Sequence, residues 1–218
     1  MLALDGIIHR YRDGSTVSLP SWRSESGEHW AIIGPSGSGK STFLHILAGL
    51  LRPASGRVMV SDQELHTMGE RTLDRFRGRH IGLVFQALHL VAALTVTDNL
   101  RLARYFADLP PDDARIRAVL ERLDIGGLAS QYPHRLSQGQ AQRVAIARAL
   151  VNEPLAILAD EPTSALDDRN CQQVMALLAE QARESGASLI VATHDGRVRE
   201  HMEHTLELAP GTTEAHHA

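Results

Sequence analysis

The chain has 218 residues, 43% of them hydrophobic, and a formal net charge of −4 from 22 Lys and Arg and 26 Asp and Glu. This composition suits one large domain with a packed core, and it gives no argument for nucleic-acid binding because no Lys/Arg-rich run occurs. The single cysteine, Cys171, excludes an internal disulfide and is expected to pack as a small residue of a helix.

Targeting and membrane signals are lacking in the sequence. The first ten residues carry charges where a signal peptide needs an apolar run, and no window approaches the ~18 apolar residues of a membrane-spanning helix. We therefore expect a soluble, cytoplasmic chain. If it serves a membrane, another polypeptide spans that membrane.

Strand patterns dominate the first part of the chain. Residues 1–30 are expected to form short strands with turns at Asp13-Gly14 and Ser26-Gly27. Further strands are expected at 28–34, 56–60 and 81–85, with an apolar helix at 40–50.

Helical periodicity then replaces the strand pattern from residue 88 to residue 150. It includes amphipathic segments at 98–109 and 112–123, which Pro110 and Pro111 separate. Strands return at 155–160 and 188–195, around a helix at 168–184. This order indicates an α/β core with a helical subdomain inserted in the middle.

A glycine-rich loop, GPSGSGKST, follows the strand at 28–34 and opens the helix at 40–50. It matches the phosphate-binding pattern G-x-x-x-x-G-K-[ST] in the strand-to-helix context that this pattern requires. Backbone N–H groups of the loop are expected to line phosphates, Lys40 to reach the β/γ oxygens and Ser41 to ligate Mg²⁺. The residues expected at the nucleotide are Gly34, Pro35, Ser36, Gly37, Ser38, Gly39, Lys40, Ser41 and Thr42.

Two carboxylates follow the strand at 155–160. Asp160 ends this strand, where it is expected to hold Mg²⁺ and its water shell, as in other P-loop NTPases. Glu161 is the next residue and is expected to take a proton from an attacking water. The alternative is an ordinary acidic turn, which the neighbouring glycine-rich loop makes the weaker interpretation.

The segment LSQGQ, residues 136–140, begins a second helix that is suited to an anion. Ser137 is expected to cap the helix and Gln140 to complete a capping box. Gly139 leaves room for a phosphate near N–H groups at the positive end of the helix dipole. The chain therefore has two phosphate-seeking helix starts.

The order of these motifs resembles that of nucleotide-binding subunits of the ATP-binding cassette (ABC) family over essentially the whole chain. GPSGSGKST resembles the Walker A motif, Gln86 in LVFQ the Q-loop, LSQGQ the signature motif, and LAILADEP Walker B. SALD, from Ser164 to Asp167, resembles the D-loop, and His194 in VATHD resembles the switch histidine. One residue departs from the family pattern, because Gln138 stands where the LSGGQ signature has glycine.

The resemblance implies an ATPase that binds ATP and Mg²⁺ between two copies of the chain paired head to tail. Ser137 and the Gly139 N–H would contact the γ-phosphate held by the partner's Walker A, and His194 would hold the catalytic water with Glu161. Tyr11 stands where the family has an aromatic that stacks on adenine; the alternative is a half-buried strand tyrosine. The resemblance also implies that Gln86 takes part in catalysis and binds the metal. It implies that the nucleotide is contacted by Gln138, Gln140 and Asp167.

The resemblance also implies one domain over 1–218. Residues 1–87 and 151–218 would form a P-loop NTPase (RecA-like) α/β core with an N-terminal antiparallel β subdomain. Residues 88–150 would form the inserted α-helical subdomain that carries the signature motif.

The segment at 87–100, ALHLVAALTVTDNL, resembles one branch of the family, the ATPases of lipoprotein release, macrolide efflux and cell division. The implied partner is an integral-membrane permease, through which the chain would sit on the inner face of the cytoplasmic membrane. Alternatives remain open: an importer ATPase for amino acids or metals, a soluble ABC ATPase, and a nucleotide-gated regulator that does not hydrolyse ATP. The cargo and its direction are not readable from this chain.

Overall fold

The computed structural model describes residues 1–164 and 166–209, whose strands form two sheets. The first is antiparallel and is built on β1 (Leu2–Arg10), which pairs with β2 (Thr16–Ser18), β3 (Trp22–Ser24) and β5 (Ser55–Val60); β5 also pairs with β6 (Gln63–Glu64). The register of β1 against β5 shifts between Asp5 and Ile8. A Cβ on Gly56 would lie 2.4 Å from the Gly6 carbonyl oxygen, so the close approach of these strands requires glycine.

The second sheet is parallel, with the strand order β10-β4-β9-β8-β7. Its strands are β4 (His29–Ile33), β7 (Ile81–Val84), β8 (Ala156–Asp160), β9 (Ser188–Thr193) and β10 (His204–Glu207). The three inner strands are almost wholly buried, as expected for apolar strands covered on both faces. Polar residues that follow their carboxyl ends meet at one edge of the sheet, where α/β proteins place ligands.

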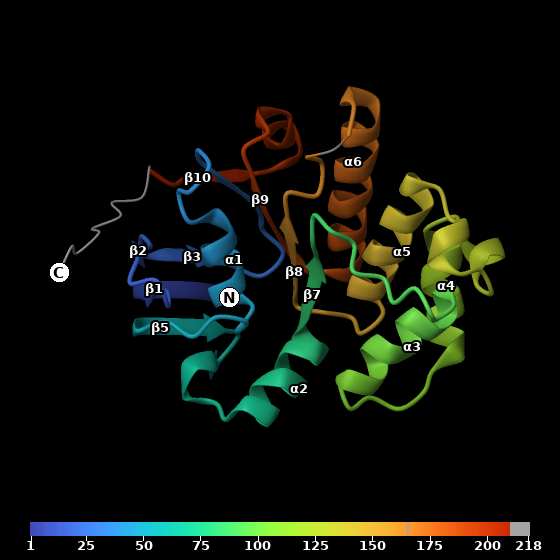
Figure 1. Cartoon of the computed structure of the whole chain (residues 1–218), viewed down its shortest axis with the longest axis horizontal. Coiled ribbons are helices and arrows are strands. Elements are labelled where there is room, and N and C mark those ends of the chain that lie inside the picture. The colour runs from blue at the N-terminus through green and yellow to red at the C-terminus, as the bar shows by residue number, and fades with distance from the viewer. Residues whose placement is uncertain (165, 210–218) are drawn as a thin grey trace.

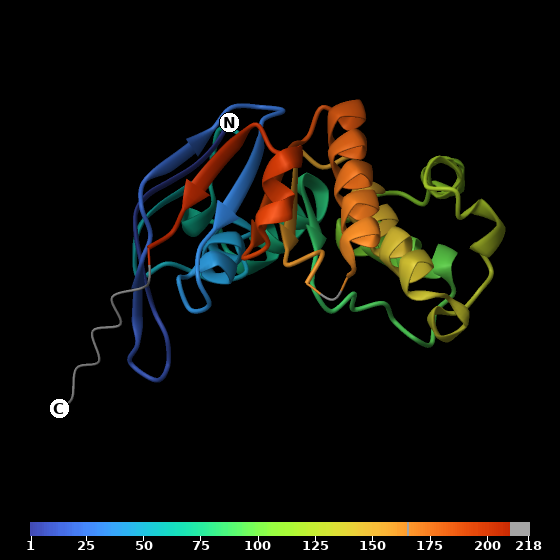
Figure 2. The same ribbon diagram turned by 90° about the horizontal axis from the view of Figure 1, so that it is seen from above.

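Helix α1 (Lys40–Leu47) lies between the two sheets, as Figures 1 and 2 show. Phe43, Ile46 and Leu47 are fully buried there, against residues of β1, β5, β8 and β9. Helices α5 (Gln138–Leu150) and α6 (Asp168–Ser185) cover the other face of the parallel sheet with a second apolar cluster. Helix α1, which follows the glycine-rich loop, is therefore packed between the antiparallel sheet and the parallel sheet.

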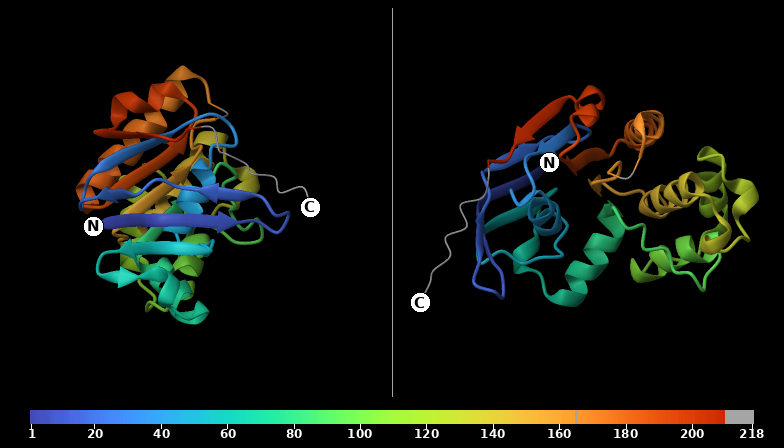
Figure 3. Two further views of the ribbon diagram at one scale, coloured as in Figure 1. Left: turned by 90° about the vertical axis from the view of Figure 1, so that its left-hand side faces the viewer. Right: turned by 45° about the horizontal axis from the view of Figure 1, so that its top comes forward.

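Helices α3 (Val96–Phe106) and α4 (Asp113–Arg122) lie at the end of the molecule farthest from the antiparallel sheet (Figure 3). Short 3₁₀ turns connect the elements at Leu65–Thr67, Gly126–Leu128, Pro133–Arg135 and Gly196–His201. Among the residues described, no helix is both long and apolar enough to cross a membrane. The α/β fold class is thus confirmed, whereas the division at residues 87/88 and 150/151 stays a prediction.

Apart from the 3₁₀ turns, three elements were not expected from the sequence, and one predicted helix is shorter than expected. Helix α2 (Glu70–His80) and strands β6 and β10 are additional elements. Helix α1 ends at Leu47 rather than residue 50, because Gly49 adopts the left-handed conformation that terminates helices. A Cβ on Gly49 would lie 2.8 Å from Leu73 of α2, so this glycine also allows α2 to pack.

His29 of β4 is a buried ionisable group away from the carboxyl edge of the sheet. Its side chain is fully buried, and neither ring nitrogen has a hydrogen-bond partner within residues 1–164 and 166–209. Burial, with a smaller contribution from Arg183, lowers the pKa of His29, while Glu203 opposes the shift. The folded state therefore holds His29 neutral at a pH where the unfolded chain binds a proton.

We predict that the free energy of unfolding decreases as pH falls below about 6.5, the pKa of an unperturbed histidine. In His29→Leu this decrease should be smaller, as measured by urea unfolding at several pH values. His134→Leu, which removes an exposed histidine, is the matched control and should keep the wild-type dependence. An unchanged pH dependence in His29→Leu would assign it to other groups.

Candidate functional site

The glycine-rich loop between β4 and α1 leaves its backbone open to a ligand. Gly37 and Gly39 have φ of +80° and +93°, in the left-handed region that favours glycine. Nothing lies within 4 Å of a Cβ placed on Gly37, so a ligand can approach the main chain closely there. The Ser38 hydroxyl is buried and has no hydrogen-bond partner among the described residues. The open backbone of the loop thus offers its N–H groups to a ligand rich in oxygen.

Lys40 brings a positive charge into this loop. Its Nζ donates hydrogen bonds to the carbonyl oxygens of Gly34 and Pro35 at 2.9 and 3.0 Å, and it lies 4.0 Å from Glu161 Oε1. The Lys40 side chain is 8% exposed. Because the ammonium is held at the centre of the loop, an anion bound there would meet a desolvated cation.

Ser41 and Asp160 form an oxygen pair beside Lys40. Ser41 Oγ donates to Asp160 Oδ1 at 3.1 Å, which joins the start of α1 to the end of β8. Burial raises the pKa of Asp160, and the Ser41 hydrogen bond opposes the shift. Hydroxyl and carboxylate oxygens are the donors that Mg²⁺ prefers, so the pair fits this ion. Gln86 is exposed after β7, and the structure does not bring it into hydrogen-bond contact with either residue.

Glu161 is held in an unusual backbone conformation with both carboxylate oxygens occupied. Its φ is +47°, which costs energy for a residue other than glycine. Its N–H donates to the Ala192 carbonyl at 2.8 Å, and Thr193 Oγ1 donates to its Oε2 at 2.9 Å. His194 Nδ1 lies 2.8 Å from its Oε1. The end of β9 thus fixes the carboxylate that follows β8.

Tyr11 lies in the same hollow as the glycine-rich loop. Its hydroxyl is 2.6 Å from that of Thr42, and the His9 ring meets it edge-on at a centroid distance of 4.6 Å. The hollow has a volume of about 380 Å³ and is also lined by Lys40 and Glu161. The structure therefore brings Tyr11, Walker A and Glu161 together.

The signature segment lies elsewhere. Ser137 and Gln140 form the predicted capping box, with Ser137 N donating to Gln140 Oε1 at 2.9 Å and Gln140 N donating to Ser137 Oγ at 3.3 Å. Ser137, Gln138 and Gly139 are exposed, and a Cβ on Gly139 would have no neighbour within 4 Å. Residues 136–140 do not line the Lys40 hollow. The N-terminus of α5, the second helix start suited to an anion, is therefore exposed on the surface of the single chain.

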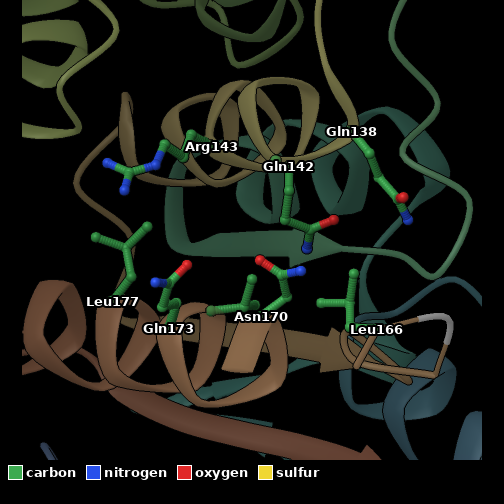
Figure 4. Close-up of a pocket in the computed structure, with 9 residues that line it drawn as sticks. Gln138, Gln142, Arg143, Leu166, Asn170, Gln173 and Leu177 are labelled. Atoms are coloured by element: carbon green, nitrogen blue, oxygen red, sulfur yellow. The ribbon is translucent and has the colours of Figure 1, made fainter. Parts of the chain in front are cut away.

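A separate hollow of about 100 Å³ separates the start of α5 from α6 (Figure 4). Gln142 points from α5 towards Asn170 of α6, and Gln138 also lines this hollow. Asp167 caps α6 by accepting from the Asn170 N–H at 2.8 Å. Gln138 therefore replaces the family's glycine without disturbing the cap of α5. Neither Asp167 nor Gln138 reaches the Lys40 hollow of its own chain.

Sequence reasoning missed two side chains at the site, Thr193 and His45. Thr193 directly precedes His194 and bonds to Glu161 as described above. His45 Nε2 lies 3.8 Å from Asp160 Oδ2. For each residue the sequence offers a partial signal: His45 follows Ser41 by one helical turn, and Thr193 lies in a predicted strand directly before His194.

Comparison with known proteins agrees with this geometry. The family model described as ABC transporter matches residues 18–164. An uncharacterized ABC transporter ATP-binding protein of Thermotoga maritima is 46% identical over 171 residues, which cover 78% of this chain and 73% of that protein. The lipoprotein-releasing system ATP-binding protein LolD of Chromohalobacter salexigens is 36% identical, covering 97% of this chain and 92% of that protein.

The macrolide export protein MacB of Escherichia coli O157:H7 is 43% identical over 188 residues, which are 85% of this chain and 29% of that longer protein. The dimeric post-hydrolysis structure of the ATP-binding cassette MJ0796, bound to ADP and Pi, superposes with a TM-score of 0.86 and 34% identity, covering 98% of this chain and 97% of that one. On its sequence match, its fold and its site, the chain belongs to the ABC transporter family, as an ATP-binding subunit with ATPase activity.

Proposed function

We propose that two copies of this chain pair head to tail around two ATP-Mg²⁺ and drive a separate membrane permease in lipoprotein release, efflux or periplasmic mechanotransmission. The observation that carries the proposal is the convergence of Lys40, Ser41 and Asp160 with Glu161 and His194 at one edge of the parallel sheet. A cation, oxygen atoms of the kind that Mg²⁺ prefers and an oriented carboxylate lie together there, as phosphoryl transfer to water requires.

The glycine-rich loop and Lys40 would bind the phosphates, and Tyr11 would stack on the base. Loop N–H groups supply donors, while Lys40 neutralises charge. The Tyr11–Thr42 hydrogen bond fixes the ring before nucleotide arrives, which lowers the entropy cost of stacking.

Ser41 and Asp160 would hold Mg²⁺, with Gln86 joining them. The ion, when bound, would neutralise charge on the β- and γ-phosphates. Glu161 would accept the proton of the attacking water, and the oxygen contacts to Thr193 and His194 aim its carboxylate. His194 has a 63% exposed side chain, so it would also face the γ-phosphate and the water.

Each site would be completed by the partner's signature segment. Ser137 and Gly139 are exposed at a capped helix start, and residues 136–140 do not line their own chain's nucleotide hollow. Gln138, Gln140 and Asp167 would lie at the same interface. The dimeric form of the similar MJ0796 cassette supports this arrangement.

A groove between α2 and α3 is the candidate docking surface for the permease. It has a volume of about 300 Å³ and includes Phe85, His89, Phe106 and Arg148. Phe85 directly precedes Gln86, so the groove is continuous with the predicted Q-loop. Phe106 is 66% exposed at the rim of the groove, where a docked permease segment would cover its ring. Such docking would place the chain on the cytoplasmic face of the membrane.

We predict that Phe106→Asp reduces co-purification of the permease with an affinity-tagged chain from native membranes by about tenfold, since removing an aromatic anchor costs about 1–2 kcal/mol or more. Tyr105→Asp is the matched control. Tyr105 is also exposed, at 74%, but it borders a different hollow, with Leu109 and Pro111. Tyr105→Asp should retain the permease.

Equal recovery of the permease with both variants would exclude this groove as the docking surface. Failure of the wild-type chain to retain any multispanning membrane protein would instead favour the alternative of an ABC ATPase that regulates another partner. The identity of the retained protein would separate release and efflux from import.

A further inference from the structure

The turn that follows β9 connects directly to the carboxylate of Glu161. Thr193 Oγ1 accepts a hydrogen bond from the Asp195 backbone N–H at 3.0 Å and donates one to Glu161 Oε2 at 2.9 Å. Because a hydroxyl has a single proton, the bond from Asp195 orients that proton towards Glu161. The direction of the Glu161 carboxylate thus depends on the conformation of residues 193–195.

The Asp195 side chain gathers three parts of the chain around this turn. Arg197 Nε and Nη2 donate to its two oxygens at 2.8 and 2.5 Å, and the Arg197 N–H donates to Oδ1 at 3.0 Å. Thr163 Oγ1 lies 3.4 Å from Oδ2, and Cys171 Sγ lies 3.8 Å from it. Thr163 is two residues after Glu161, and Cys171 lies on α6. The Asp195 carboxylate therefore connects Thr163, which follows Walker B, with Cys171 in the first turn of α6 and with the turn that follows His194.

Arg197 extends this connection to the start of α6. Its Nη1 donates to Asp168, the first residue of that helix. The Asp195 side chain is 12% exposed, and the hydrogen bonds from Arg197 lower the pKa of Asp195 to about 2. Asp195 is therefore ionised throughout the neutral range. A bidentate arginine–carboxylate pair within a network of charges constrains geometry more than an isolated surface pair does.

We propose that Arg197 and Asp195 are positioning residues of the ATPase reaction, which lock the turn 193–197 so that Thr193 and His194 hold both oxygens of Glu161. The lock also ties this carboxylate to Thr163 and Asp168, the residues on either side of the predicted D-loop. The proposal rests on the proposed role of Glu161 as general base. Neither Arg197 nor Asp195 touches the nucleotide hollow, so the lock acts only through Thr193, His194 and Glu161.

The test compares Arg197→Met with Arg199→Met in steady-state ATP hydrolysis. Arg199 lies on the same short helix and is exposed, so its substitution is the matched control. Arg197→Met should lower kcat about tenfold, the typical cost of losing a group that orients a catalytic residue, with KM for ATP changed less than about twofold. Arg197→Lys, which retains one charged donor, should recover part of kcat. Arg199→Met should behave as wild type.

A double-mutant cycle with Thr193→Val tests whether the lock acts through the Thr193 hydroxyl. If it does, Thr193→Val/Arg197→Met should be no slower than the slower single variant, whereas independent effects would multiply. The contacts of α6 with residues 200 and 201 remain in Arg197→Met, so its melting temperature should stay near that of Arg199→Met.

The proposed positioning role would be contradicted by a wild-type kcat in Arg197→Met or by equal changes in its kcat and KM. Multiplicative effects of the two substitutions in the double-mutant cycle would also contradict it. Glu161→Gln, assayed in parallel, separates this outcome from a failure of the proposed function. If Glu161→Gln is inactive while Arg197→Met matches its control, the lock alone is wrong. If Glu161→Gln turns over near the wild-type rate, the general-base role is wrong.

Discussion

Glu161→Gln is expected to lower ATP turnover by about 10²–10⁴-fold, the range typical for loss of a general base, while ATP affinity stays near that of the wild type. Glutamine keeps an oxygen that can accept from Thr193, so the shape of the site is retained. It cannot accept a proton from water. It also removes the negative charge 4.0 Å from Lys40, which leaves the ammonium free for phosphate.

A well-matched control for this substitution is Glu153→Gln. Glu153 also has a left-handed backbone, with φ +53°, but it is exposed and pairs with Arg115 away from the site. Its variant should hydrolyse ATP at the wild-type rate, which separates the carboxylate chemistry of Glu161 from its backbone strain. Turnover would be measured by phosphate release, and affinity by calorimetry at low temperature. Near-wild-type turnover in Glu161→Gln would remove this residue from the mechanism.

Much of the site is predictable from the sequence because its motifs are local. The glycine-rich loop, Asp160 and the capping box of α5 depend on residues within a few positions of one another; the capping box forms as predicted, and Asp160 ends its strand as predicted. Thr193 was not predicted as a partner of Glu161, because the contact joins strands 32 residues apart in sequence through sheet pairing. Local pattern places Thr193 in a strand, but it carries no information on which residue the side chain contacts.

Two of the unpredicted elements, α2 and β10, were missed for a related reason. Helix α2, ERTLDRFRGRH, has few apolar residues and is stabilised by packing Leu73 under the short turn at Gly49. Strand β10, HTLE, has no buried residue and forms by pairing with β4 at the edge of the parallel sheet. Tertiary contacts therefore override weak local preference in both elements.

The exposed signature segment leads to the second large prediction. If each site takes Lys40 from one chain and Ser137 from the other, Lys40→Ala and Ser137→Arg should each prevent occlusion of ATP in a homodimer. A mixed dimer of the two variants then contains one doubly damaged site and one site with an intact loop and an intact signature. We expect one occluded nucleotide per mixed dimer, against none in either homodimer.

The measurement uses Glu161→Gln in every chain, so that an occluded nucleotide persists long enough to count. Two different affinity tags isolate mixed dimers, and retained radiolabelled ATP is counted after gel filtration. Loss of the Ser137 cap costs about 1 kcal/mol of helix stability, so folding of Ser137→Arg is checked by circular dichroism. Occlusion is a better readout than turnover, because a dimer with one live site can bind ATP and still fail to cycle.

A reciprocal mixture makes the outcome decisive. Here one chain carries both Lys40→Ala and Ser137→Arg, and its partner carries neither. Sites shared between chains would then each contain one defect, so this dimer should occlude nothing. Sites completed within one chain would give the opposite results, with occlusion in the reciprocal mixture and none in the first. That reversal would refute the shared site and leave the exposed, capped start of α5 without a phosphate to bind.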